Sequence, residues 1–474
     1  MCTSDESERS VRYGAKAKEI LPDNSRRDFL KKIVLVSSMV TFGIRKDSFG
    51  SVKPKQGRPG DPSCTVFRSV NGKPDENLIK VIELAGRIEE IIGEYDVVVI
   101  KPNVQWWNQG APNLLALKTF IELIMDRPGG FKGEVIVAEN CHRGREPWKS
   151  RSSGWMPHFG WNSDIKGIKN MNELCAELKK KYGERFSVCH WIDVDAGGMR
   201  VYGPQDGPGY VYCDGTGGVP LISYSNGLKG DKRREVIMTY PIFQSDKGTI
   251  IDFKNGVWNK GAYTGQPLRF INFPALNHHS TYCGATSAIK NYLGISDLSG
   301  GADPNNGGRL TRGYYNFHSF PFDKWAPGPR PGMLGAEIAV FMNKVRKADL
   351  NITSAEWVGL ASRVRPPMVR TRAVLASTDP VALDYHATKY LLYANSGMSI
   401  HNPDDHTSPL HQYLKACAVA GGGIFHESCV AIKTFDFSTH SLSDNDDLAI
   451  KADRHWGTDF RTILKYFVLK YIKT

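Results

Sequence analysis

Residues 95–103, Tyr-Asp-Val-Val-Val-Ile-Lys-Pro-Asn, decide the fold class of this chain of 474 residues. The run from Val97 to Ile100 consists of β-branched apolar side chains, which is typical of a strand buried on both faces of a parallel sheet. Residues 112–127 follow with apolar side chains at helical spacing, and residues 133–138 form a second run typical of a buried strand. Strand, helix and strand in this order predict two strands of a largely parallel sheet with a helix packed against it.

The same alternation of strand and helix patterns continues to residue 433. Further helices are expected at residues 168–182, 281–293, 335–346, 380–393 and 409–419, and further strands at residues 186–194, 268–274, 348–353, 369–376 and 428–433. Three stretches interrupt the alternation, at residues 141–167, 196–232 and 296–334. We therefore expect an α/β fold with a largely parallel sheet, helices on both of its faces and long loop insertions.

The amino-terminal region carries a targeting pattern. Ser25-Arg26-Arg27-Asp28-Phe29-Leu30 precedes a moderately apolar run at residues 33–44, as in a twin-arginine signal. This run is too short to cross a bilayer core as a helix, which takes about 20 apolar residues. We expect residues 1–50 to be a signal segment read by the twin-arginine translocase, and the protein to be periplasmic or otherwise extracytoplasmic. Whether the segment is cleaved or stays as an anchor is open.

The remaining chain divides into a linker, a domain and a tail. Residues 51–64 are rich in proline and glycine and indicate a linker, and residues 65–440 hold the α/β domain. In the tail, residues 441–474, apolar side chains from Phe460 to Ile472 recur at helical spacing, with basic residues mostly off that stripe. This helix either packs on the body of the protein or lies on a membrane surface.

Charge and cysteine content exclude several classes of site. The net charge of +12 is dispersed, and the short basic runs at residues 179–181 and 232–234 lie in no nucleic-acid motif, so we expect no nucleic-acid partner. The nine cysteines include no Cys-x-x-Cys pair. The local signatures of zinc-ribbon, thioredoxin-type and ferredoxin-type iron–sulfur sites are therefore missing.

Polar residues follow the first two predicted strands directly. Lys101 and Asn103 come after the first strand, and Glu139 comes at the end of the second. Open α/β sheets bind their ligands at the carboxyl ends of the strands. Lys101 and Asn103 are therefore candidate catalytic residues, and Glu139 is a candidate metal ligand.

Further candidates lie near predicted helix starts. His278 precedes a helix that carries Lys290, and imidazole is the commonest transition-metal ligand. Asp379, before Pro380, is either a capping aspartate or a ligand, and Asp384 follows inside that helix. Lys290 joins the catalytic candidates. His278, Asp379, Asp384 and Glu139 form the candidate set for a divalent metal, while a hydrogen-bonding or substrate-binding role for His278 remains open.

Three segments together resemble the domain of unknown function 362 family. They are Val98-Val99-Ile100-Lys101-Pro102-Asn103, the stretch from Phe273 to Gly294 with Asn277-His278-His279, and Leu375-Ala376-Ser377-Thr378-Asp379-Pro380 with Asp384. The resemblance implies an α/β domain over roughly residues 90–435, often behind a twin-arginine leader, but no settled activity. Asn277 stands where the family usually has lysine.

Two functions follow as expectations. The first is an exported enzyme that depends on a metal or another cofactor, with oxidoreductase chemistry favoured because of the export route and the resemblance. The second is a non-catalytic periplasmic protein that binds a ligand or glycan, using the tryptophans of residues 141–167 (Trp148, Trp155 and Trp161) to stack on it.

Overall fold

A computed structural model of the chain describes residues 63–140, 153–156, 158, 160–191, 200–225, 235–298, 331–444 and 449–455. The expected signal segment, nearly all of the linker and the amphipathic stretch at residues 460–472 lie outside the described residues. Within the described residues, no helix combines the length and the apolar character that crossing a membrane requires.

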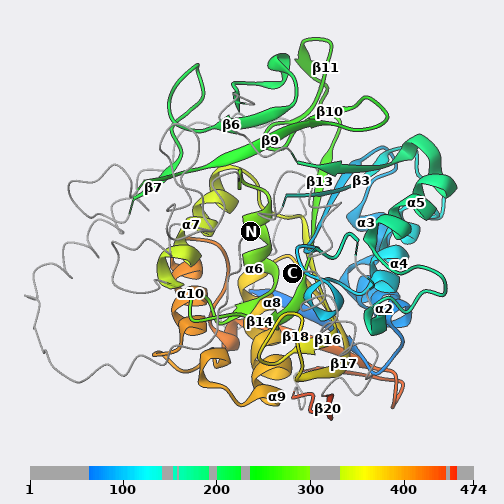
Figure 1. Cartoon of the computed structure of the whole chain (residues 1–474), viewed down its shortest axis with the longest axis vertical. Coiled ribbons are helices and arrows are strands. Elements are labelled where there is room, and N and C mark those ends of the chain that lie inside the picture. Colours follow the sequence, from blue (N-terminus) through cyan, green and yellow to red (C-terminus); the bar gives the residue numbers. More distant parts are fainter. Residues whose placement is uncertain are drawn as a thin grey trace, which may run out of the picture. The chain divides into compact units, whose positions relative to one another are not determined.

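A large sheet forms the centre of the domain (Figure 1). Its strands follow the order β19-β18-β1-β17-β16-β13-β2-β3-β4, with β14, β15 and β20 attached to this path. The bounds are β1 Cys64–Val70, β2 Val97–Pro102, β3 Glu134–Glu139, β4 Phe186–His190, β13 Leu268–Phe273, β14 Ala275–His278, β15 Ala285–Thr286, β16 Leu350–Gly359, β17 Met368–Ser377, β18 Val430–Asp436, β19 Ser441–Asp444 and β20 Arg454–His455. From β16 through β13, β2 and β3 to β4 all pairs are parallel, whereas β17 is antiparallel to both β16 and β1.

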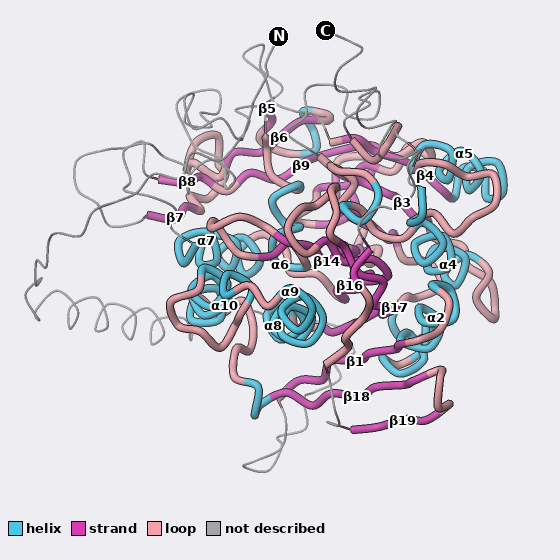
Figure 2. Tube along the Cα trace, turned by 60° about the horizontal axis from the view of Figure 1, so that its bottom comes forward, coloured by secondary structure: helices cyan, strands magenta, loops and turns pink. Residues whose placement is uncertain are grey.

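Helices cover both faces of this sheet, as the sequence predicts (Figure 2). One face carries α2 Pro74–Ala85, α3 Arg87–Ile91, α4 Leu114–Met125 and α5 Met171–Tyr182, and the other carries α6 Ala288–Asn291, α7 Pro331–Lys344, α8 Pro380–Ala387 and α10 Pro409–Val419. Side chains of β2 alternate between the two cores: Val98 and Ile100 pack with the α4 face, and Val97 and Val99 with the α7 face. The valine run is buried on both sides, which is why it lacks polar alternation.

A second sheet, which the sequence patterns did not predict, packs against the α7 side of the domain (Figure 1). Its order is β12-β11-β10-β9-β6-β5, with bounds β5 Arg200–Val201, β6 Gly209–Tyr212, β9 Thr239–Gln244, β10 Ile250–Asp252, β11 Gly256–Asn259 and β12 Ala262–Tyr263. A two-stranded ribbon pairs β7 Ser223–Ser225 with β8 Glu235–Ile237. The glycine-rich stretch 196–232 was therefore wrongly interpreted as a loop where it is described, because Tyr210, Val211 and Tyr212 are buried core residues.

The helix expected at residues 281–293 is much shorter. Residues 275–286 instead form a hairpin in which Asn277 of β14 pairs with Thr286 of β15. Gly284 has a φ of +75°, a left-handed conformation that ends any helix before it. Only α6 and a 3-10 turn, Tyr292–Gly294, remain helical. The helix expected at residues 380–393 is present as α8 followed by a π-helical stretch, Thr388–Tyr393, and α9, Ala394–Ser396.

Candidate active site

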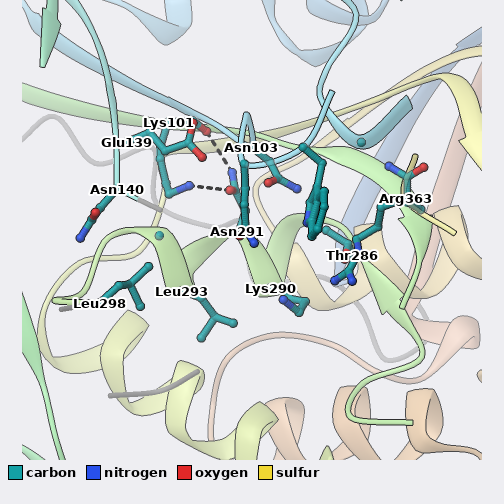
Figure 3. Close-up of a pocket in the computed structure, with 15 residues that line it drawn as sticks. Lys101, Asn103, Glu139, Asn140, Thr286, Lys290, Asn291, Leu293, Leu298 and Arg363 are labelled. Carbon is teal, nitrogen blue, oxygen red and sulfur yellow. Dashed lines mark hydrogen bonds between the residues drawn. The ribbon is translucent and has the colours of Figure 1, made fainter. Parts of the chain in front are cut away.

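A small polar pocket lies at the carboxyl ends of the parallel strands β2 and β3, beside the β14–β15 hairpin and α6 (Figure 3). Its volume is about 30 Å³, which is room for only a few water molecules. The residues that line it are Lys101, Asn103, Gln105, Trp106, Gly110, Glu139, Asn140, Asn277, Thr286, Lys290, Asn291, Leu293, Gly294, Leu298 and Arg363. Lys101, Asn103, Glu139 and Lys290, which the sequence suggested separately, are thus brought together.

Lys101 is the most deeply buried cation of the pocket, with 1% of its surface exposed. Its ammonium donates hydrogen bonds to Asn291 Oδ1 at 2.6 Å and to the Pro102 carbonyl at 2.9 Å. A β-carbon at residue 294 would lie 2.7 Å from the Lys101 nitrogen, so only glycine leaves space for this side chain at that position. Lys101 therefore has a fixed position beside the pocket.

A chain of hydrogen-bonded asparagine side chains fixes the position of Lys101. Asn291 donates to the Lys101 carbonyl at 3.0 Å and to Asn272 Oδ1 at 2.7 Å. Asn272 in turn donates to Asn351 Oδ1 at 2.8 Å. These asparagines are all buried, and a connected polar network in a dry interior fixes the orientation of its members. The chain ties α6 to β13 and β16 and keeps Asn291 at the pocket.

Glu139 supplies a buried carboxyl group at the end of β3, with 3% of its surface exposed. Its two oxygens both accept from the Val104 amide, each at 3.0 Å. Burial raises the pKa of Glu139 to about 7, against the opposing effects of the Lys101 charge and of the backbone hydrogen bonds. The group is therefore able to hold or release a proton close to neutral pH.

The raised pKa of Glu139 predicts a pH dependence of stability. A carboxyl whose pKa is about 7 when folded, against an ordinary 4.5, binds its proton more tightly in the native state. Its contribution to the free energy of unfolding therefore falls as the pH rises from about 4.5 to about 7. We expect Glu139→Gln to flatten the stability profile over this interval, measured by urea unfolding at several pH values. An unchanged slope in the variant would contradict the raised pKa.

Lys290 and Arg363 add positive charge on the other side of the pocket (Figure 3). Burial lowers the pKa of Lys290 to about 8; the Arg363 and Lys101 charges act in the same direction, and Cys283 acts against them. Arg363 donates to His279 Nε2 at 3.0 Å, and its guanidinium lies 4.9 Å from the ring centre of Trp106. Three cationic side chains thus face one carboxyl group, which favours an anionic ligand.

The remaining predicted site residues lie elsewhere. Asp379 does not line the pocket, although Ser377, at the end of β17, is level with Lys101 across the sheet. Asp379 instead caps α8, accepting from Val381 and Ala382 amides at 2.9 Å each. The capping interpretation of Asp379 is therefore confirmed.

His278 does not line the pocket, although its neighbour Asn277 does. Successive side chains of a strand point to opposite sides, and His278 Nδ1 lies 2.9 Å from His401 Nε2. Among the described histidine, cysteine, aspartate and glutamate side chains, no three gather in a way that could hold a metal ion. The predicted ligand set of His278, Asp379, Asp384 and Glu139 is thus not brought together.

Asp384 stabilises the helix α6, which carries two of the pocket residues. Its two oxygens accept from the first amides of α6, Ala288 N at 2.7 Å and Ile289 N at 2.9 Å. Burial raises the pKa of Asp384 to about 7, although these hydrogen bonds oppose the change. Asp384 therefore positions the short helix that carries Lys290 and Asn291.

Some pocket residues had no clear signal in the sequence. Arg363 lies in the loop between β16 and β17, and only the local run Arg363-Val364-Arg365 marked it as basic. Of the tryptophans proposed to stack on a ligand, Trp155 is buried against His190, with ring centres 4.3 Å apart, and Trp148 lies outside the described residues. Trp155 is thus a core residue, whereas Trp106, which precedes residues 141–167, lines the pocket.

Residues 266–389 match a family model described as Domain of unknown function (DUF362). The matched segment runs from β13 to α8 and supplies Asn277, Thr286, Lys290 and Arg363 to the pocket. Lys101 and Glu139 precede it. Neither the curated proteins nor the solved structures contain a match to the chain.

Proposed function

We propose that the protein is an enzyme that binds a small carboxylate in this pocket and transfers a proton to or from it. The observation that carries the proposal is the buried Glu139 carboxyl group, which faces the cationic side chains of Lys101, Lys290 and Arg363 at the carboxyl edge of the sheet. An anion would be attracted by these charges, and Glu139 would handle the proton.

The pocket geometry supports a small ligand. Its volume of about 30 Å³ admits the anionic end of a molecule rather than a nucleotide or a sugar chain. Lys101 is already held by Asn291 and Pro102, so it loses little side-chain freedom when an anion binds. The pocket is thus organised before the ligand arrives.

Glu139 fits the part of a general acid or base. Proton transfer by a side chain is most effective when the pKa lies near the working pH, and the pKa of Glu139 is raised to about 7 by burial. Asn103 lines the same pocket and offers a neutral hydrogen-bonding group for the ligand, whereas the Asn140 amide donates to Tyr210 Oη and to the Ser296 carbonyl. Oxidoreductase chemistry remains a further proposal that rests on the expected export route. Metal and cofactor analysis of the exported protein would test it.

The first test is binding of pyruvate, a small carboxylate, followed by calorimetry. We expect Lys101→Met to weaken binding by about tenfold to a hundredfold, because a hydrogen bond to a charged group contributes about 1.5–3 kcal/mol. The matched control is Lys180→Met, which removes an exposed lysine of α5 and should bind pyruvate like the wild type. Equal affinity in both variants, or no binding by the wild type, would contradict the proposal.

A non-catalytic binding protein is the second candidate, and the rigid amide network around Lys101 favours it. Exchange of the pyruvate methyl protons for deuterium, followed by nuclear magnetic resonance, separates the two functions. An enzyme with Glu139 as base should accelerate the exchange, and Glu139→Gln should slow it by about a hundredfold. Binding without accelerated exchange would favour the non-catalytic protein.

A further inference from the structure

Lys290 differs from the other cations of the pocket because its ammonium contacts no hydrogen-bond partner among the described residues. Lys101 donates to Asn291 and Pro102, and Arg363 donates to His279. Within the described part of the chain, Lys290 has neither a hydrogen-bond acceptor nor a carboxylate partner, although it is only partly exposed and lines the pocket. Burial of a cation without a partner is unfavourable, so Lys290 does not stabilise the fold as part of an ion pair. We therefore expect it to have another role.

The surroundings of Lys290 favour the neutral amine. Asp384, the carboxyl group nearest to the start of α6, is bonded to the Ala288 and Ile289 amides. The charged groups across the pocket are Lys101 and Arg363, which repel an ammonium, and Glu139, whose pKa is raised to about 7 by burial. With its pKa lowered to about 8, Lys290 is partly a free amine near neutral pH, which is the nucleophilic form.

We propose that Lys290 forms an imine with the carbonyl carbon of a small oxo acid, whose carboxylate lies between Lys101 and Arg363. The inference rests on the function proposed above and names its substrate class. An oxo acid matches the pocket because it carries an anionic group and a reactive carbonyl group within a few atoms. The small volume of the pocket restricts the ligand to a molecule about as large as a small oxo acid.

The step balances with the groups that the pocket supplies. The Lys290 nitrogen attacks the carbonyl carbon and forms the C–N bond, while the electron pair of the C=O bond moves to oxygen. Transfer of one proton from nitrogen and of one from the Glu139 carboxylic acid converts that oxygen into water, which leaves. The products are a protonated imine on Lys290, one water molecule and the Glu139 carboxylate, with no change in oxidation state. The carboxylate is then available as the base for the carbon next to the imine.

Reductive trapping tests this inference. The full-length protein is incubated with pyruvate and sodium cyanoborohydride, digested and analysed by peptide mass spectrometry. We expect one saturable adduct on Lys290, with the added mass of pyruvic acid less one oxygen atom. Lys290→Arg keeps the positive charge but has no nucleophilic amine and should form no adduct, whereas Lys180→Met should form it like the wild type.

The possible outcomes separate the two proposals. Pyruvate binding that depends on Lys101, with no adduct on Lys290 after reduction, would overturn the imine and leave the anion-binding function in place. Absence of both binding and adduct would overturn both. Labelling of Lys290 no faster than that of the exposed Lys180 would also overturn the inference, because it would show ordinary lysine reactivity.

Discussion

Replacement of Asp384 by alanine is expected to lower the free energy of unfolding by about 2–5 kcal/mol. Asp384 is 2% exposed, and its carboxyl group accepts from the Ala288 and Ile289 amides. Alanine would leave both buried N–H groups without an acceptor, and each such group costs about 1–3 kcal/mol. Urea unfolding followed by tryptophan fluorescence measures the loss.

The same variant should lose pyruvate binding while it is still folded. The helix α6 has only four residues, so it cannot maintain its position without the contacts at its start. Lys290 and Asn291, both on α6, would move away from the pocket. Asp384→Asn keeps one accepting oxygen and should show a smaller loss of stability. Asp453→Ala, which changes an exposed aspartate, serves as control. A stability within about 0.5 kcal/mol of the wild type would contradict the supporting role of Asp384.

The part of the site that follows β2 and β3 could be predicted from the sequence. The apolar runs that end at Ile100 and Ala138 indicated buried parallel strands, and parallel strands end at the same edge of a sheet. Lys101 and Glu139 were therefore expected at one edge of the sheet, and the pairing of Ile100 with Val137 places them side by side there. That expectation needed only local patterns and one topological rule.

Strand direction could not be predicted in the same way. The residues of β17 mix apolar with polar side chains like those of β16, and such a pattern does not indicate in which direction the strand runs. The antiparallel course of β17 depends on the connection after Gly359, which brings the chain straight back along β16. Asp379 lies just beyond the end of β17 and does not line the pocket, and its local pattern described only a helix cap.

Long-range contacts also limited the prediction of the pocket. Arg363 is separated from Trp106 by more than half of the chain, and their contact depends on the placement of two loops. The pairing of β14 with β15 sets which side of the strand Asn277 and His278 face. Local spacing contains neither fact, so His278 was expected at the site while Asn277 occupies it.

Replacement of Arg26 and Arg27 by lysine should abolish export and leave the protein in the cytoplasm. The translocase reads the two guanidinium groups of this pattern, and lysine keeps the charge but cannot reproduce their planar, forked hydrogen bonding. Fractionation of cells that express the wild type, the double variant and Arg58→Lys measures the effect. Arg58→Lys changes a basic residue of the expected linker and should leave export unchanged.

A strain without the twin-arginine translocase gives the decisive comparison. The wild-type protein should accumulate in its cytoplasm, as is expected of the double variant in normal cells, because we propose that the two arginines before the apolar run at residues 33–44 address the protein to this route. Salt and detergent washes of the membrane fraction from normal cells test the proposed surface contact of residues 460–472, since a basic amphipathic helix on anionic lipid is released by salt. Export that is unaffected by loss of the translocase would show that Arg26 and Arg27 belong to an ordinary basic terminus, and the case for oxidoreductase chemistry based on this route would lapse with it.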